Sequence, residues 1–92
     1  MSTLVRFPPS NVTKDQYEAV RGALSDAGAW PPDGCELHVA FGDDQDVRVS
    51  EVWESREKFD AFGQTLMPEL EKAGIQLSGQ PEFFDTVRVD TF

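Results

Sequence analysis

The chain has 92 residues, of which 39% are hydrophobic and 27% are charged, and its formal net charge is −9. This length corresponds to a single domain, residues 1–92, and the composition is too apolar for a disordered chain. Nucleic acids and anionic membranes bind clustered Lys and Arg, so 17 acidic residues against 8 basic ones argue against both partners. No apolar run approaches the roughly 20 residues of a membrane span. The N-terminus lacks the features of a signal peptide, and the single cysteine fits a reducing cytoplasm.

The first half of the chain predicts a strand, a helix and a second strand. Residues 3–7 alternate and are rich in strand formers, and a Pro-Pro pair ends them. Thr13 and Gln16 have the spacing of a capping box, and an apolar stripe follows at helical spacing until Gly28. The sequence AWPPDG at 29–34 predicts a stiff loop, and residues 35–41 predict the second strand.

The second half predicts a strand, a helix and a last strand. Turn-forming residues at 42–46 lead into a third strand at 47–54. Ser55 is the expected N-cap of the second helix and Gly74 its expected end, while Pro68 must kink or restart it. The apolar stripe of this helix consists of Phe59, Phe62, Leu66, Leu70 and Ala73. Residues 82–89 predict the fourth strand.

The order β-α-β-β-α-β is the signature of a ferredoxin-like α+β sandwich, in which two helices cover one face of a four-stranded antiparallel sheet. Right-handed crossovers then give the strand order 4-1-3-2.

Matching apolar residues across the central hairpin assigns the two faces of this sheet. Each strand has one mainly apolar face, and burying both faces under the helices removes the most apolar surface from water. On the second strand this face carries Leu37, Val39 and Phe41, and on the third it carries Val47, Val49, Glu51 and Trp53. His38 is then expected on the outer face, opposite Ser50, together with Ala40 and Arg48. The outer face mixes apolar side chains with arginines, which suits coverage by a second subunit.

The element order, the third strand ending in VWES, the helix sequence REKFDAF and the LMPEL segment resemble the dimeric α/β-barrel superfamily. Within it they are most similar to the antibiotic-biosynthesis-monooxygenase-like domains. The resemblance implies a homodimer in which two sheets pack face to face, with a small-molecule pocket between sheet and helices. It also implies that Trp53 lines that pocket.

The haem-degrading branch of that superfamily carries an asparagine on the first strand and a histidine on the second helix. This chain offers Arg6 on the first strand and no histidine in the second helix. Without an axial ligand, haem binding is not expected. We predict no cofactor and no metal site, because the acidic residues are not spaced as clustered ligands.

Two residues are candidate catalytic groups. Glu51 either pairs with a basic residue or, unpaired in an apolar pocket, acts as a general base. His38 is either a hydrogen-bonded structural residue or an acid/base group.

Five further residues are candidate substrate contacts. Trp53 either caps the core or forms a stacking wall for a flat ligand. Tyr17 and Phe62 belong to the helical stripes and would contribute pocket walls. Trp30 lies in a loop that either folds over the pocket as a lid or docks on the body. Arg48 either forms salt bridges between subunits or binds an anionic ligand.

Three functions remain open at this point. The first is a cofactor-independent enzyme, monooxygenase-like or proton-transferring, that acts on a hydrophobic or aromatic substrate. The second is a non-catalytic carrier or sensor that uses the same pocket. The third is a structural interaction dimer without a pocket.

Overall fold

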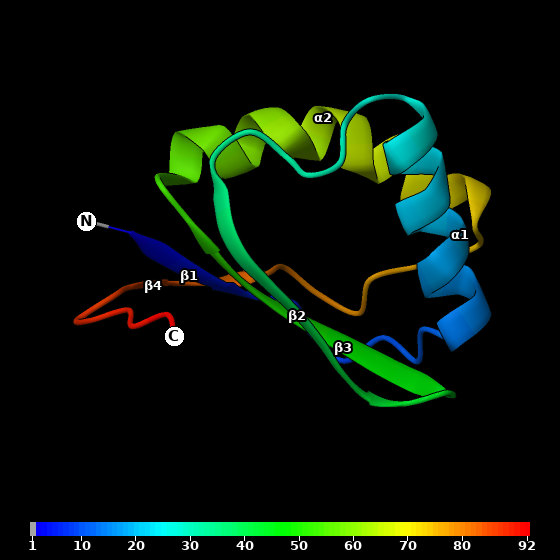
Figure 1. The fold of residues 1–92 in the computed structure, drawn as a ribbon. Helices are drawn as coiled ribbons and strands as arrows, with labels where there is room; N and C mark the ends of the chain where they lie inside the picture. Colours follow the sequence, from blue (N-terminus) through cyan, green and yellow to red (C-terminus); the bar gives the residue numbers. More distant parts are fainter. Residues whose placement is uncertain (1) are drawn as a thin grey trace.

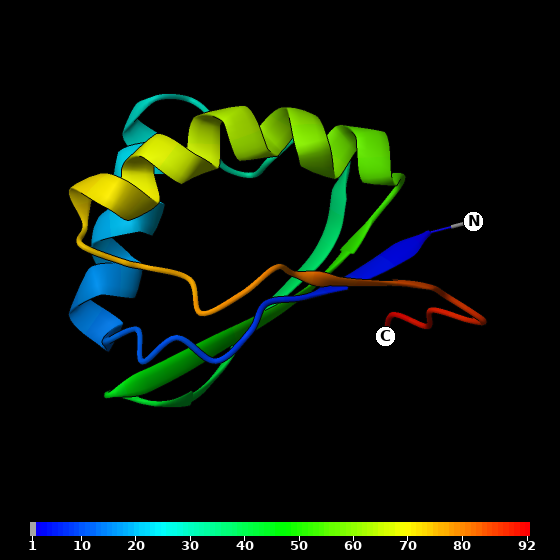
Figure 2. The ribbon, with the colours of Figure 1, turned by 180° about the vertical axis from the view of Figure 1, so that it is seen from behind.

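The computed structural model describes residues 2–92 and contains four strands and two helices. In chain order these are β1 (Thr3–Arg6), α1 (Lys14–Asp26), β2 (Cys35–Asp43), β3 (Asp46–Trp53), α2 (Arg56–Lys72) and β4 (Glu82–Asp85). The strands form one antiparallel sheet in the order β2-β3-β1-β4, which is the predicted order read from the other edge. Both helices cover the same face of this sheet (Figures 1 and 2). The predicted ferredoxin-like α+β fold is confirmed.

Both helices begin and end where the sequence predicts. The Thr13 hydroxyl accepts from the Gln16 backbone N–H, and the Gln16 side chain accepts from the Thr13 N–H, which completes the capping box. Ser55 caps α2 in the simpler way, by accepting from the Lys58 N–H. Each helix is followed by a glycine with φ +74°, Gly28 or Gly74, in the left-handed conformation that favours this residue.

Pro68 lies inside α2, which continues through it to Lys72 rather than restarting.

Hydrogen bonds at their ends hold the helices in place over the sheet. The Gln16 side-chain amide donates to the Ala73 carbonyl oxygen at 3.2 Å, joining the start of α1 to the end of α2. The Lys14 N–H donates to the Asp44 carbonyl, so α1 also begins against the tip of the β2–β3 hairpin. Between these contacts lies an apolar core made of Val5, Val20, Leu24, Trp53, Phe59 and Phe62.

The register of the β2–β3 hairpin differs from the one that apolar matching predicts. Asp43 pairs with Asp46, so the connecting loop has two residues and every odd-numbered residue near the turn opposes an even-numbered one. Apolar matching had paired odd residues with odd. In a hairpin the loop length fixes the register, because a change of one residue sends each side chain to the opposite face.

As a consequence, β2 presents the opposite side chains to the helices. His38 pairs with Glu51 on the helix-covered face, and Ala40 pairs with Val49; the predicted outer-face position of His38 opposite Ser50 was wrong. The outer face instead carries large apolar side chains that are 42–48% exposed, namely Leu37, Val39 and Phe41. A bulge between Cys35 and Leu37 then restores the odd pairing, with Cys35 opposite Trp53.

The predicted fourth strand at 82–89 is too long. β4 ends at Asp85, which pairs with Thr3, the first residue of β1. Because β1 is the only partner of β4 within residues 2–92 and runs antiparallel to it, β4 loses its partner where β1 begins. The chain beyond Asp85 turns back beneath the outer face (Figure 1), where it lies along Leu4 and Val52.

A glycine substitution at the hairpin tip, compared with a control inside α2, tests the geometry of the turn. Gly42 has φ +110°, and a Cβ there would overlap the Asp46 carbonyl oxygen. Gly42→Ala should therefore lower the free energy of unfolding by more than about 1 kcal/mol. The matched control is Gly63→Ala inside α2, where a Cβ meets nothing within 4 Å; it should stabilise by roughly 0.5–1 kcal/mol. Urea unfolding measures both, and equal stability of the two variants would contradict the described turn.

Candidate functional site

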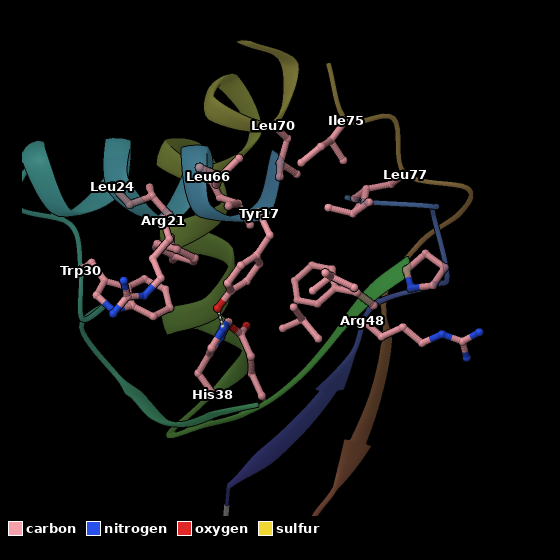
Figure 3. A pocket seen from close by; sticks show the side chains of 18 residues that line it. Tyr17, Arg21, Leu24, Trp30, His38, Arg48, Leu66, Leu70, Ile75 and Leu77 are labelled. Atoms are coloured by element: carbon pink, nitrogen blue, oxygen red, sulfur yellow. Dashed lines mark hydrogen bonds and ion pairs between the residues drawn. The ribbon is translucent and has the colours of Figure 1, made fainter. Parts of the chain in front are cut away.

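A cavity of about 100 Å³ lies between the sheet and the two helices (Figure 3). Most of its wall is apolar and comes from α1, α2, the inner face of the sheet and the segment after α2; the apolar residues include Phe7, Val20, Leu24, Phe62, Leu66, Leu70, Ile75 and Leu77. A cavity with these surroundings favours ligands that are largely apolar.

A chain of hydrogen-bonded side chains forms the polar part of this wall. The Tyr17 hydroxyl is 2.8 Å from His38 Nε2, and His38 Nδ1 is 2.7 Å from Glu51 Oε2. The other carboxylate oxygen, Glu51 Oε1, accepts from the indole N–H of Trp53 at 3.0 Å. Four residues from α1, β2 and β3 are thus linked in one line from the cavity wall into the core.

Burying these hydrogen-bonded side chains costs free energy. The Glu51 side chain is only 3% exposed, and His38 is 18% exposed. Moving a carboxylate out of water costs several kcal/mol unless other groups compensate it. Here His38 and Trp53 each satisfy one carboxylate oxygen, so the cost of burying Glu51 is met by partners that fix its orientation.

Two protonation states of His38 fit these distances. An ionised carboxylate only accepts, so His38 Nδ1 carries the hydrogen that is donated to Glu51. In the neutral imidazole Nε2 then accepts from the Tyr17 hydroxyl, whereas in the imidazolium the Nε2–H donates to the Tyr17 oxygen. A carboxylate that orients a histidine, which in turn accepts a proton from a hydroxyl, is an arrangement suited to general acid/base chemistry.

The secondary structure accounts for how these groups meet. On α1, Tyr17, Arg21 and Leu24 are spaced by about one turn and share the face that lines the cavity. On the sheet, His38 and Glu51 are directly opposed across an antiparallel pair, which puts their side chains next to each other on one face.

Trp30, in the loop between α1 and β2, adds an aromatic ring beside the polar residues of the cavity wall. The ring of Trp30 meets that of His38 edge-on, with centroids 4.8 Å apart and an interplanar angle of 90°. The Arg21 guanidinium lies 5.7 Å from the centre of the Trp30 ring. The loop is held to the body by the Lys58–Asp33 ion pair at 2.7 Å.

Six of the seven sequence-predicted site residues line this cavity: Glu51, His38, Tyr17, Phe62, Trp30 and Arg48. Trp53 is fully buried behind the wall and contacts two residues that line the cavity, Glu51 and Phe62. Arg48 touches the rim, but its guanidinium points away (Figure 3) and donates to Asp46 at 3.1 and 3.2 Å.

Sequence reasoning did not include Arg21 or the apolar residues after α2, Ile75 and Leu77. The position of Arg21 four residues after Tyr17 was the available signal, because it places both on one side of a helix. Nothing in the sequence places the segment 75–77 against the cavity.

Two pKa shifts bear on the chemistry near the cavity. Burial raises the pKa of the Tyr17 phenol above 10.0, Arg21 acts in the opposite direction, and the carboxylates of Glu18 and Glu51 add to the rise. Burial also raises the pKa of the Cys35 thiol from 9.0 to about 11, with Glu51 adding to the effect. A nucleophilic cysteine requires a lowered pKa, so Cys35 is not suited to that role.

Within residues 2–92, no group of three or more His, Cys, Asp or Glu side chains is arranged to hold a metal ion. In the same part of the chain, neither helix is long and apolar enough to cross a membrane.

No protein-family model matches the chain, and no curated protein matches it in sequence. Solved structures do share its fold. A Chloroflexus aurantiacus protein described as a "putative antibiotic biosynthesis monooxygenase" is 20% identical with a TM-score of 0.64, over 98% of this chain and 96% of that one. A Caulobacter crescentus protein with the same description is 16% identical with a TM-score of 0.60, over 95% and 89%. A Mycobacterium tuberculosis protein is 18% identical with a TM-score of 0.50, over 98% and 95%.

These similarities establish the class of fold to which the chain belongs. The expected likeness to antibiotic-biosynthesis-monooxygenase-like proteins is confirmed, at the level of the fold. Identities of 20% or less carry no residue-by-residue assignment, so the chemistry of the site has to be argued from its own geometry.

The raised pKa of Tyr17 predicts a loss of stability at alkaline pH. Between the ordinary value of 10.0 and the higher folded value, the folded protein binds more protons than the unfolded chain. This contribution to the free energy of unfolding is therefore complete below pH 10 and disappears as the pH rises through the folded pKa. Tyr17→Phe should flatten the alkaline decline, measured by urea unfolding at a series of pH values.

The thiol of Cys35 contributes with the same sign between pH 9.0 and about 11. Tyr17→Phe is therefore compared with the protein that keeps Tyr17, both in a Cys35→Ala background. The slope against pH is the readout, because the loss of the hydrogen bond to His38 lowers stability at every pH. Equal slopes with Tyr and with Phe at position 17 would contradict the buried phenol.

Proposed function

We propose that this chain is a small-molecule-binding protein of the dimeric α/β-barrel type, and that its cavity binds a hydrophobic or aromatic compound. We further propose that it is an enzyme that transfers a proton without a bound cofactor. The observation that carries the proposal is the hydrogen-bonded series Tyr17, His38 and Glu51, which ends at an otherwise apolar cavity.

In this proposal each group has a distinct task. Glu51 holds the imidazole of His38 in one tautomer and stabilises the imidazolium that forms when His38 takes up a proton. Trp53 keeps the carboxylate of Glu51 in place by donating to its second oxygen. Most of the wall is apolar, which lowers the effective dielectric constant around these groups and strengthens their electrostatic interactions.

Proton removal is the first step of both reaction types left open by the sequence. In an isomerisation the proton returns to another atom of the substrate. In a cofactor-independent oxygenation the resulting anion reacts with oxygen. The geometry of Tyr17, His38 and Glu51 supports this shared first step.

A non-catalytic carrier or sensor is the alternative function. It is favoured by the fact that both nitrogens of His38 and both oxygens of Glu51 already have hydrogen-bond partners within the protein. A closed network of this kind also stabilises a fixed cavity shape. The presence of the cavity argues against the third possibility, a structural dimer with a filled interior.

We also propose a cytoplasmic homodimer formed through the outer face of the sheet. That face exposes large apolar side chains on both edge strands, β2 and β4, whereas monomeric proteins seldom expose extended apolar patches; the residues are Leu37, Val39, Phe41 and Phe84, each 42–48% exposed.

Light scattering tests the dimer. The wild type should have twice the monomer mass at micromolar concentration, and Phe41→Asp should shift the mass toward the monomer because it places a charge in the apolar interface. Met67→Asp is the matched control, since Met67 is 50% exposed but lies on α2, away from the sheet. A monomeric wild type would contradict the proposed assembly.

Ligand binding is tested by tryptophan fluorescence with flat aromatic compounds. The structure makes Trp30 the expected reporter, because it lines the cavity while Trp53 is buried behind Glu51. Saturable quenching should persist in Trp53→Phe and disappear in Trp30→Phe. For a compound that is turned over, His38→Gln and Glu51→Gln should each lower kcat by about 10²–10⁴-fold with a much smaller change in binding.

The outcomes separate the candidate functions. Turnover that survives both substitutions would contradict the assigned acid/base role. Binding of many compounds with turnover of none would favour the carrier. A panel that gives no quenching and no chemical-shift change of cavity residues would contradict a ligand-binding cavity.

A further inference from the structure

We propose that the number of protons on the His38–Glu51 pair selects the ligand of this cavity by reversing the hydroxyl of Tyr17. With one proton on the pair, Tyr17 presents a hydrogen-bond acceptor to the cavity. With two protons, it presents a donor. This inference rests on the proposed function, because it describes how the same cavity distinguishes between ligands, and it makes His38 a residue that acts through Tyr17.

One proton lies between His38 and Glu51 in both states. His38 Nδ1 and Glu51 Oε2 are 2.7 Å apart, a distance that two unprotonated atoms with lone pairs do not adopt. The second carboxylate oxygen, Oε1, accepts from the indole N–H of Trp53 at 3.0 Å and needs no proton of its own. The first proton of the pair is therefore held between Nδ1 and Oε2, and His38 Nε2 is the position that remains for a second one.

The state of His38 Nε2 decides the direction of its hydrogen bond with Tyr17. Nε2 and the Tyr17 oxygen are 2.8 Å apart, which fits a hydrogen bond in either direction. Without a proton, Nε2 only accepts, so the one hydroxyl proton of Tyr17 points at His38. With a proton, Nε2 only donates, so the Tyr17 oxygen accepts and its own proton is released from this bond.

The geometry of a phenol makes this exchange a reversal on the side of the cavity. A phenol O–H bond prefers the plane of the ring, so the oxygen has two in-plane positions, and His38 takes one of them in both states. The other position holds a lone pair while the proton points at His38, and it holds the proton once Nε2 is protonated. Tyr17 lines the cavity and is partly exposed, which makes this second position available to a ligand.

The neighbouring polar side chains do not offset the change. Both nitrogens of His38 and both oxygens of Glu51 are engaged within the network in each state. The Arg21 guanidinium, 5.7 Å from the centre of the Trp30 ring, offers donors only, whatever the proton count of the pair. Tyr17 is therefore the side chain through which the proton count of the pair reaches a ligand.

The other charged and titratable groups near the pair come from three elements. They are Tyr17, Glu18 and Arg21 on α1, Cys35 on β2, and Arg48 on β3. The part of α2 that lines the cavity is apolar, and the loop before β2 contributes the ring of Trp30.

Near neutral pH, histidine is the side chain whose proton count changes most readily. Arginine side chains do not lose their proton in proteins. Burial raises the pKa of both the Tyr17 phenol and the Cys35 thiol, so both stay protonated at neutral pH. Glu18 is exposed to solvent and is tested separately below.

The reversal matters once a ligand replaces water. The cavity is open to solvent on one side, and water, which both donates and accepts, satisfies Tyr17 in either state. A ligand N–H group matches the state with one proton, and a ligand carbonyl oxygen matches the state with two. A mismatched ligand places two donors or two acceptors against each other, which costs free energy because each loses its hydrogen bond to water.

Indole and 1-indanone test the inference, because they are of nearly the same size and neither changes charge near neutral pH. Indole offers an N–H donor, and 1-indanone offers a carbonyl acceptor. As the pH falls through the step at which His38 gains its second proton, the affinity of the wild type for indole should fall about fivefold, and that for 1-indanone should rise about fivefold. Calorimetry at a series of pH values measures both affinities.

Nitrogen-15 NMR of His38, the only histidine of the chain, reports the proton on each ring nitrogen. In the ligand-free protein, Nε2 should gain its proton over the pH range in which the two affinities change. Bound 1-indanone should move this step to higher pH and bound indole to lower pH. Binding and protonation are reciprocal, so a ligand that prefers the state with two protons also favours uptake of the second one.

Substitutions identify the hydroxyl as the group that reverses. Tyr17→Phe should abolish the opposite pH dependences of the two ligands, while His38 still gains its second proton. Glu18→Gln is the matched control, since it removes the titratable group next to Tyr17 on the same helix; it should keep both pH dependences. Circular dichroism confirms that each variant is folded at every pH used.

The possible failures are distinguishable. Affinities for indole and 1-indanone that change in the same direction, or opposite changes that persist in Tyr17→Phe, would overturn this inference and leave a ligand-binding cavity in place. An Nε2 whose protonation does not change while the affinities do would have the same consequence. If neither compound binds at any pH, the inference is overturned; if the aromatic panel also gives no quenching and no chemical-shift change, the proposed function is overturned with it.

Discussion

The hydrogen bond between His38 and Glu51 is the interaction on which the rest of this structure depends. It joins the edge strand β2 to β3 on the helix-covered face, and it provides one of the two partners that make a 3% exposed carboxylate tolerable. Removing either partner would leave an uncompensated polar group in the core, which costs more than the bond itself contributes. A purely structural core of this size has no need for such a pair, since apolar residues of similar volume would pack there at lower cost.

The pair also connects the fold to the site. Its inner end is fixed by Trp53, the largest fully buried side chain, which in turn packs against Phe59 and Phe62 of α2 with ring centroids 5.5 and 5.4 Å apart. Its outer end meets Tyr17 from α1. The position of the Tyr17 hydroxyl is therefore set by both helices and by two strands at once, which is the kind of support that holds a reacting group in one geometry.

The register of the β2–β3 hairpin also explains why the two faces of the sheet differ. The inner face places the polar groups against an apolar cavity, and the outer face is left with Leu37, Val39 and Phe41. The chain after β4 covers only the part of the outer face near Leu4 and Val52. The two-residue loop at the hairpin tip thus determines both the hydrogen-bonded series of Tyr17, His38 and Glu51 and the apolar surface proposed as the dimer interface.

The sequence by itself determined the order of elements, both helix starts and ends, the strand order and the class of fold, because caps, glycines and periodic apolar residues are local signals. It also singled out Glu51, His38 and Tyr17. Only the tertiary structure decided that these three meet. Loops of two or three residues are both compatible with the polar segment 42–46, and the two choices send His38 to opposite faces. The bulge beside Cys35, the end of β4 and the position of Trp53 behind Glu51 depend on partners distant in the sequence, so no local pattern specifies them.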